Sequence, residues 1–522
     1  MARIEDTLKL GPWNMGVRYD LPSEDISPKG FRQMENVRLS AAAAAEKVLG
    51  TTSYAGASAI AAAPTLTACG EYRIPGGDAV VFAIAGTKLY LYSSGWVDKT
   101  GSVTITAADD NTWEWVRAFN YMVALNGVDT DAIKWDGSGN ATALDDNARF
   151  TKGKHIGFWD NRLWIGNVNG ATDRVYYSAI GNIESWSATD FLNLGSPITG
   201  MAPVGTRLAI HTEDAIHTVS PTGNATYPYE LNQRTSTDQN NPQRGGTISG
   251  RALVSVPGVG QLFVLDDGIY QWQGGDQISK VSTALDLGYW DSLNNARLGQ
   301  SFAIYYAGKQ EVWFFLPFGS SQTNMNHIMV MSTRHKYVDP DSNQERFAWY
   351  GPYTGTTTTF DRNCAAIIDN KPHAGNFGGK LLDHAPVNIF SHEDTAYTSY
   401  FETGAPPPYG GDVSLVWLYA RCYYDALGSY SLAVRQESQG VGSNAGTLNT
   451  TGGGEVLGSF VLDTSSLGTV RMVSKDVELR GYDPHSSLKF TNSNKDEPFR
   501  VRHTHLQYGV IGRQRKPTAG IT

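Results

Sequence analysis

A unit of two short strands recurs along most of this 522-residue chain. Its clearest copy covers residues 203–223 (PVGTRLAIHTEDAIHTVSPTG), in which residues 207–211 and 215–219 are short runs rich in apolar and β-branched residues. Two such runs bounded by turn residues predict an antiparallel hairpin. Because a repeated unit determines the architecture of a whole fold, the repeat constrains this chain more than any single motif.

The spacing of the repeat predicts a propeller. One apolar position marks each copy, and neighbouring copies lie 33 to 69 residues apart: Leu89, Met122, Leu163, Leu208, Leu262, Val312 and Leu381. Four-stranded propeller blades repeat about every 40–50 residues, so degenerate blades with loop insertions fit this spacing. A jelly roll or stacked sandwiches would also contain short strands, but neither predicts the same unit again and again. We therefore expect an all-β protein with a degenerate β-propeller of six or seven blades.

The composition agrees with this expectation. The chain has 56 Gly, 13 Trp and 26 Tyr with only 18% charged residues, which suits short strands joined by tight turns. Two polar stretches, residues 227–250 and 332–344, are predicted to be projecting loops.

The pattern changes after residue 390. Residues 403–411 contain three consecutive prolines and three glycines, which is typical of a domain junction. We place the propeller at residues 61–395 and a C-terminal β-sandwich platform domain at residues 396–522. The Gly-, Ser- and Asn-rich stretch 440–454 is predicted to be a loop. Strands of the sandwich are predicted at residues 413–424, 429–436, 459–463, 469–480, 487–490 and 499–509.

Residues 1–60 are predicted to form an N-terminal arm with a hairpin that belongs to the platform. Residues 40–47 (SAAAAAEK) have high helix propensity, with Ser40 as the N-cap. So short a helix is marginal without tertiary support. The alternative is a hairpin in which residues 36–39 pair with residues 47–50 across the alanines.

Cysteine usage and hydropathy indicate where the chain is made. Cys69, Cys364 and Cys422 are too far apart for a metal motif or a disulfide framework, so free thiols of a protein folded in the cytosol are expected. The N-terminus lacks the basic and apolar regions of a signal peptide. No run reaches the roughly 18–20 apolar residues that span a bilayer. We expect a soluble protein without a membrane span.

Charge is unevenly distributed along the chain. The net charge is −9, yet residues 471–522 carry ten Lys and Arg against five Asp and Glu. An acidic body with a basic end argues against general coating of nucleic acid, which requires a dense basic surface. The basic cluster Arg513, Arg515 and Lys516 is the candidate contact with a partner or with DNA, against the alternative of a solvated tail.

No catalytic motif is evident. The nucleophile elbow, the Walker loop, the H-E-x-x-H helix and the C-x-x-C pair are all absent from the sequence. Glycosidases need two carboxylates about 5–10 Å apart. The adjacent pairs 109–110 and 266–267 are interpreted as turn acids, because neighbours on a strand point to opposite faces. Asp136-Gly137 and Asp267-Gly268 are interpreted as turn dipeptides. We expect no catalytic site, no cofactor and no enzyme activity.

Two other patterns have a plainer structural interpretation. His503 and His505 would share one face of a strand, but no third metal ligand is evident, so no metal site is expected. Six tryptophans within strand patterns could form a sugar platform, although packing between sheets is the favoured interpretation: Trp159, Trp164, Trp272, Trp290, Trp313 and Trp349.

Four short segments, in order along nearly the whole chain, resemble one family. Residues 30–50 (GFRQMENVRLSAAAAAEKVLG) resemble its opening, an Asn-Val-Arg strand followed by a Lys-x-x-Gly strand; residues 41–45 replace the usual Arg-Pro-Gly element. Residues 198–223 (ITGMAPVGTRLAIHTEDAIHTVSPTG) resemble its most recognisable blade. Residues 375–389 (GNFGGKLLDHAPVNI) and 505–517 (HLQYGVIGRQRKP) resemble its last blade element and closing strand. The family is the tail nozzle or tail hub of short-tailed bacteriophages (podoviruses), also known as packaged-DNA stabilisation proteins.

The resemblance implies a structural virion protein. It would form a homohexamer below the portal and adaptor rings, contact tail fibres or spikes, and retain the genome until infection. Genomic double-stranded DNA would pass through its channel without sequence-specific binding. The implied location is the virion tail, after synthesis in the bacterial cytoplasm. The alternative is a tail-associated propeller that binds or degrades glycans.

Overall fold

The computed structural model describes residues 4–74, 76–108, 112–144, 149–235, 245–339, 343–355, 360–405, 413–438, 441–450, 471–479 and 486–513. Strands dominate this part of the chain, and its helices are short 3-10 turns. None of the described helices is long and apolar enough to cross a membrane. The all-β prediction is confirmed.

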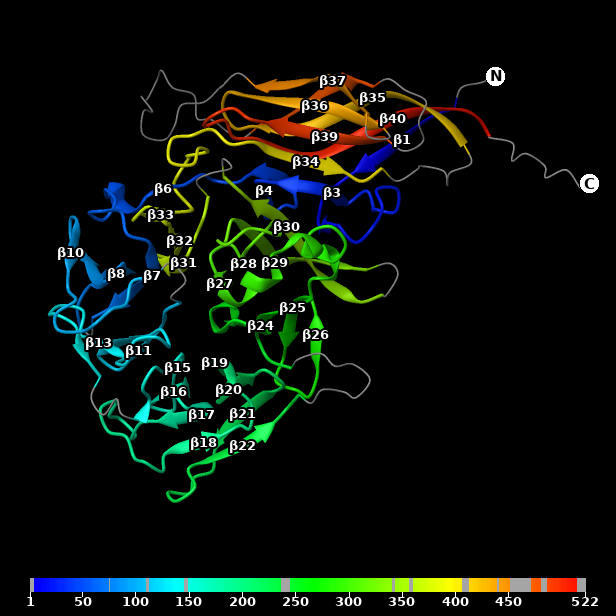
Figure 1. The fold of residues 1–522 in the computed structure, drawn as a ribbon. Coiled ribbons are helices and arrows are strands. Elements are labelled where there is room, and N and C mark those ends of the chain that lie inside the picture. The colour runs from blue at the N-terminus through cyan, green and yellow to red at the C-terminus, as the bar shows by residue number, and fades with distance from the viewer. Residues whose placement is uncertain are drawn as a thin grey trace, which may run out of the picture.

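Seven four-stranded units of the described chain surround a common centre (Figure 1). Each unit is antiparallel, and its strands follow one another in chain order except in the seventh unit. The first blade contains β7 (Leu66–Arg73), β8 (Ala79–Ala85), β9 (Lys88–Tyr92) and β10 (Trp96–Asp98). The second contains β11 (Glu114–Ala118), β12 (Tyr121–Leu125), β13 (Ile133–Trp135) and β14 (Thr142–Ala143). The third contains β15 (His155–Trp159), β16 (Arg162–Val168), β17 (Ala171–Tyr177) and β18 (Phe191–Asn193).

The next three blades continue the ring. They are β19 (Ile198–Val204), β20 (Arg207–Thr212), β21 (Ile216–Pro221) and β22 (Tyr229–Gln233); β23 (Val254–Val256), β24 (Gly260–Leu265), β25 (Gly268–Trp272) and β26 (Ile278–Lys280); and β27 (Phe302–Tyr306), β28 (Glu311–Leu316), β29 (His327–Val338) and β30 (Glu345–Tyr353). The connecting 3-10 turns are η3 (Gly250–Ala252), η4 (Thr283–Leu285), η5 (Trp290–Ser292) and η6 (Asn295–Gln300).

The seventh blade closes the ring with a strand from the start of the chain. Its first three strands are β31 (Cys364–Ile368), β32 (Lys371–Gly375) and β33 (Leu381–Asp383). Its outer strand is β6 (Thr52–Ser53), which precedes the first blade and is followed by η1 (Tyr54–Gly56). The two ends of the propeller are therefore joined by backbone hydrogen bonds as well as by packing of β31 against β7.

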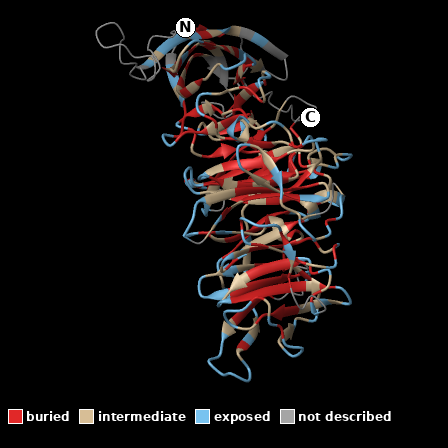
Figure 2. Ribbon diagram, turned by 90° about the vertical axis from the view of Figure 1, so that its left-hand side faces the viewer, coloured by how far each residue is buried: buried red, intermediate tan, exposed pale blue. Residues whose placement is uncertain are grey.

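Alternating side chains hold neighbouring blades together. On β16, Leu163 and Ile165 pack toward the second blade, whereas Trp164 packs toward the fourth. On β8, Phe82 packs toward the second blade and Val81 toward the seventh. Because successive side chains of a strand point to opposite faces, a strand buried on both faces appears as a continuous apolar run. Figure 2 shows these strands as buried layers, with exposure concentrated in the loops.

Two further sheets form a platform beside the ring. Their strands are β1 (Ile4–Leu10), β2 (Gly16–Val17), β3 (Gly30–Glu35), β4 (Val37–Leu39), β5 (Ala45–Lys47), β34 (Ser399–Thr403), β35 (Val413–Ala426), β36 (Tyr430–Ser438), β37 (Val441–Thr450), β38 (Arg471–Glu478), β39 (Ser486–Asn492) and β40 (Arg500–Arg513). In the described chain, one sheet runs β38-β35-β40-β5-β4, with β1 also on β40. The other contains β2-β3-β34-β39-β36-β37. Both described ends of the chain lie on the platform (Figure 1).

The platform and the sixth blade share one sheet. Strand β30 contacts β2 at Gly16 and Trp349, which extends β27–β30 into β2, β3 and β34 as a ten-stranded sheet of the described residues. Gly16 has φ of 69°, and a Cβ there would lie 2.1 Å from the Trp349 carbonyl oxygen. Only glycine fits this crossing.

The positions that marked the repeat explain its irregular spacing. Leu89 and Leu381 lie on third strands, β9 and β33, whereas the other five positions lie on second strands. The first interval is therefore short and the last one long.

Several local predictions were wrong. No helix forms over residues 40–47: Ala43 has φ of 54°, the Ala44 amide donates to the Ser40 hydroxyl (3.1 Å), and β5 pairs with both β4 and β40. The hairpin alternative agrees better with the structure, although residues 37–39 pair with residues 45–47 rather than with residues 47–50. Two available strand edges outcompete one turn of helix, which is unstable alone.

The three predicted loops also contain strands. Residues 332–344 include the end of β29, where His335 and Tyr337 are buried among polar neighbours. Residues 227–250 include β22, the outer strand of the fourth blade. Within residues 440–454, β37 pairs along β36 and buries Leu448. In each segment, pairing with a neighbouring strand outweighs a weak local β-propensity.

Candidate functional site

The centre of the propeller contains a cavity of about 560 Å³. Residues from the inner strands of six blades and from η3 of the remaining blade line it. Its walls combine apolar groups with a few polar ones: Trp113, Glu114, Trp115, Arg117, Phe158, Met201, Arg251, Phe302 and Cys364. A cavity of this size with few polar groups is typical of a small-molecule site.

Arg251 is one of two arginines that line this cavity, beside Arg117. Its Nη1 and Nη2 donate to the backbone carbonyls of Asn363 (2.8 Å) and Gln300 (2.7 Å). Its guanidinium lies 5.0 Å from the centre of the Phe302 ring. Burial lowers the pKa of Arg251 to about 10, against the opposing effects of Cys364 and Glu114, so the group stays charged near neutral pH.

Glu114 and His155 form a neighbouring pair. His155 Nδ1 lies 2.9 Å from Glu114 Oε1, and the Ile156 amide donates to Glu114 Oε2 (3.3 Å). A Cβ at Gly250 would lie 2.3 Å from Glu114 Oε1, so η3 approaches the pair closely. Glu114 is the single carboxylate among the described lining residues. Those residues thus lack the two facing carboxylates that glycoside hydrolysis requires.

The acidic turns behave as the sequence analysis predicted. Asp266 and Asp267 form the two-residue turn between β24 and β25, because Leu265 pairs with Gly268. Asp136 Oδ1 accepts hydrogen bonds from the Ser138 and Gly139 amides (2.8 and 2.9 Å). The pair at 109–110 lies outside the described residues.

His503 and His505 share one face of β40 and stack on Tyr423 at 4.4 and 5.1 Å between ring centres. Burial, followed by the charge of Lys9, lowers the pKa of both. In the described chain, no group of three or more His, Cys, Asp or Glu residues forms a metal-binding cluster.

Five of the six tryptophans are buried in the core, as favoured over a sugar platform: Trp164, Trp272, Trp290, Trp313 and Trp349. The sixth, Trp159, is half-buried and packs against Trp164 and Tyr229.

The predicted basic cluster is only partly reached by the structure. The Arg513 backbone ends β40 and pairs with Val413. Its side chain, and the whole of Arg515 and Lys516, lie outside the described residues. Their role as a contact stays a prediction.

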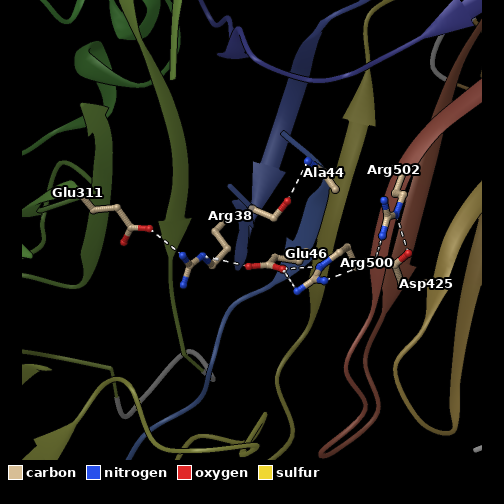
Figure 3. Close-up of polar contacts among 8 residues, drawn as sticks. Arg38, Ala44, Glu46, Glu311, Asp425, Arg500 and Arg502 are labelled. Atoms are coloured by element: carbon tan, nitrogen blue, oxygen red, sulfur yellow. Dashed lines mark hydrogen bonds and ion pairs between the residues drawn. The ribbon is translucent and has the colours of Figure 1, made fainter. Parts of the chain in front are cut away.

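A chain of alternating charges crosses from the propeller to the platform (Figure 3). Arg38 of β4 lies between Glu311 of β28 (3.0 Å) and Glu46 of β5 (3.4 Å). Arg500 of β40 continues from Glu46 (2.7 Å) to Asp425 of β35 (3.4 Å). Although burial alone would lower the pKa of Arg38, the charge of Glu311 and its other acidic neighbours raise it overall, so Arg38 stays charged.

Arg502 ends this chain. Its Nε and Nη2 donate to the two oxygens of Asp425 (2.6 and 3.2 Å). Glu311 and Asp425 are at most 1% exposed. Buried acids with paired guanidinium groups hold the junction in one geometry, because separating either partner leaves a buried charge without compensation.

Neither the cavity nor the junction could be predicted from the sequence. Glu46 lies in the segment where a helix was one alternative, and Arg38 lies in the first strand of the hairpin alternative. Arg251 directly follows the segment predicted to be a loop. Each is a single charge in an otherwise ordinary strand or turn. The available signal was a charged residue among apolar neighbours in the sequence. Such a residue does not show which oppositely charged residue it pairs with.

Neither a protein-family model nor a curated protein matches this chain. Among solved structures, it is similar to a streptogramin B lyase with 12% identity and a TM-score of 0.40, covering 64% of this chain and 97% of that one. It is also similar to virginiamycin B lyase from Staphylococcus aureus (10% identity, TM-score 0.39, 65% and 98% covered) and to BamB from Moraxella catarrhalis (11% identity, TM-score 0.34, 73% and 96% covered). The propeller assignment rests on the strand pairing itself.

Proposed function

We propose that this chain is a structural protein of the virion tail of a short-tailed bacteriophage. It forms a hexameric nozzle or hub below the portal and adaptor rings, and tail fibres or spikes attach to the assembly. The nozzle closes the DNA channel, retains the packaged genome and lets it leave at infection. The role needs neither catalysis nor a cofactor.

The joint between propeller and platform is the observation that carries this proposal. A shared sheet and a chain of ion pairs with two buried acids, Glu311 and Asp425, connect the two parts of the described chain. A ring subunit that bears the pressure of packaged DNA needs such a joint, because load applied to one part must reach the other without hinge motion. The order of sequence segments that resemble nozzle proteins supports the same role.

The charge distribution supports passage of DNA. Outside residues 471–522 the chain has a net charge of −14. An acidic channel wall would repel phosphates and prevent the duplex from sticking. Imaging of the assembled channel tests this idea, since a basic wall rich in contacts with DNA would contradict it.

The basic end is proposed to dock on an acidic ring above. Reversing the charges of Arg513, Arg515 and Lys516 to Glu is expected to weaken assembly of particles. Tail attachment is measured by counting tailed particles in electron micrographs, and unchanged attachment would exclude this docking.

Copy number in purified virions tests the nozzle proposal directly. Quantitative mass spectrometry against the capsid protein should give a small fixed number, about six for a closed ring of that symmetry. Absence from particles would refute a virion role. About threefold more copies would instead indicate a fibre or spike built from trimers.

The second candidate is a propeller that binds or degrades glycans, and the central cavity is the observation that favours it. A turnover screen on host polysaccharide, run beside a glycan-binding assay, separates the two candidates. Turnover would favour the enzyme, although only one carboxylate stands among the described lining residues.

A further inference from the structure

We propose that the central cavity of the propeller binds a small organic carboxylate, with Arg251 as its anchor. The inference concerns a site on the individual chain, so it stands whether or not the chain assembles into a tail nozzle.

The first support is the unbalanced charge of Arg251. Within the described chain, no carboxylate oxygen lies within 4.0 Å of its guanidinium nitrogens. Its two hydrogen-bond acceptors are backbone carbonyls, which carry no net charge. Arg251 is half-buried, and a cation partly removed from water is normally paired, because desolvation of an isolated ion is costly. Glu114 is the nearest acidic influence, but it is already engaged by His155 and the Ile156 amide.

The second support is a set of donors without acceptors. Arg251 Nε is buried and has no hydrogen-bond partner in the described chain. The same is true of Nε1 of Trp113, which is 3% exposed and also lines the cavity. Buried donors are rarely left unpaired. Both N–H groups are covered by protein atoms, so they act on the cavity through their positive ends, which favour an anionic ligand.

The setting of Arg251 is preorganised for such a ligand. Two carbonyls hold Nη1 and Nη2 while Phe302 supports the guanidinium plane from 5.0 Å. An arginine fixed in this way presents its remaining N–H groups to a planar anion with little loss of conformational freedom.

The rest of the cavity selects the kind of anion. Glu114 would repel a dianion more strongly than a monoanion, which favours a carboxylate over a phosphate dianion. Trp115, Phe158 and Met201 provide apolar wall for an organic body. The volume of about 560 Å³ exceeds that of a bare ion and lies within the usual range for small-molecule sites.

Matched ligand pairs test the proposal on the purified full chain. Isothermal titration calorimetry compares acetate with acetamide, benzoate with benzamide and glucuronate with glucose, and includes inorganic phosphate. At least one carboxylate should bind at least tenfold more tightly than its neutral counterpart and than phosphate. Failure of every carboxylate to bind, equal binding within every pair, or tighter binding of phosphate would overturn the proposal.

Variants assign the binding to the cavity. Arg251→Gln should weaken carboxylate binding at least tenfold, whereas the control Arg421→Gln removes an exposed arginine of the platform and should leave it unchanged. Binding by Arg251→Gln at the wild-type affinity would overturn the assignment. If Arg251→Gln fails to fold, Arg251→Lys replaces it, because lysine keeps the positive charge but lacks the planar guanidinium group. The affinity of Arg251→Lys for the carboxylate must then be lower than that of the wild type. Added salt must weaken carboxylate binding by the wild type.

Discussion

At the scale of single residues, several polar side chains are buried and form hydrogen bonds within the protein. His211 is an example. Its Nε2 donates to Gln261 Oε1 (3.1 Å), and its Nδ1 accepts from the Thr247 amide (3.3 Å). Both ring nitrogens are therefore committed in the neutral tautomer, and protonation of Nδ1 would oppose the Thr247 N–H group. Burial lowers the pKa of His211 to about 4.

We expect acid to destabilise the protein through His211. Its folded pKa lies below the unfolded value near 6.5, so the unfolded state binds more protons between pH 6.5 and 4. The stabilisation is complete above pH 6.5 and is lost as the pH falls through that window. At pH 4.5 His211 contributes about 2–3 kcal/mol to the loss. His327 and His392, whose pKa values burial lowers to about 3, add to the total in both the wild type and a His211 variant. Urea unfolding at pH 7 and 4.5 measures it, and His211→Gln should show a smaller difference. An equal difference in both proteins would contradict this assignment.

Cys69 and Cys364 come together at the closure of the ring. They lie on β7 and β31, and their Sγ atoms are 3.6 Å apart. The hydrogen bond with Cys364 and burial raise the pKa of the Cys69 thiol. Cys422 lies in the platform, where burial raises its pKa to about 12.

We expect diamide to join Cys69 to Cys364. The two thiols give up two hydrogens to diamide, which becomes the hydrazine, and a disulfide forms. The reaction should accelerate with rising pH, since the thiolate is the nucleophile. Intact mass and peptide mapping measure the product, with Cys364→Ser as the control. Disulfides to Cys422, or no loss of free thiols under denaturant-free conditions, would show that the two thiols do not meet.

At the scale of elements, some strands connect the propeller to the platform in addition to forming the sheets of each part. Strands β4 and β5 pair within the platform sheet and carry Arg38 and Glu46 toward β28 of the sixth blade. One short hairpin thereby connects both parts of the described chain.

Removing Arg38 tests how much this junction contributes to the free energy of unfolding. Arg38→Met leaves Glu311, which is 1% exposed, without its cation. Breaking a buried pair costs about 3–5 kcal/mol. The matched control is Arg421→Met, which removes a bidentate pair with Asp476 in which both side chains are more than 40% exposed. Such surface pairs contribute about 0–1 kcal/mol. Urea unfolding of both variants measures the contrast, and equal shifts would mean that the junction is not held by this arginine.

At the scale of the whole molecule, the propeller and platform share a core. One apolar cluster includes Leu262 and Trp313 of the propeller together with Phe401, Trp417 and Tyr508 of the platform. The other five clusters each lie between two neighbouring blades. Packing is thus continuous around the ring and across the joint.

We expect the two parts to unfold together. Scanning calorimetry of the wild-type chain should show a single transition, because exposing either part would open the shared cluster and the ten-stranded sheet. Two well-separated transitions would show that the propeller and platform are energetically independent. That result would also weaken the proposed role in bearing load.

The sequence by itself determined the strands of the blades, because each depends on local alternation and on turn residues a few positions away. The hairpin at residues 207–211 and 215–219, the turn at Asp266-Asp267 and the core positions of most tryptophans follow from such neighbours. The all-β class and the propeller could be predicted for the same reason.

Only the tertiary structure decided what depends on residues far apart in the chain. The pairing of β6 with β33, the strand at β37 and the hairpin of β4 and β5 arise because partner edges were available, which no local pattern encodes. The cavity around Arg251 depends on seven blades closing into a ring, and the charge of Arg38 depends on Glu311 of a distant blade. Burial and electrostatic pairing act through space, so they are set when the ring closes and the platform packs against it.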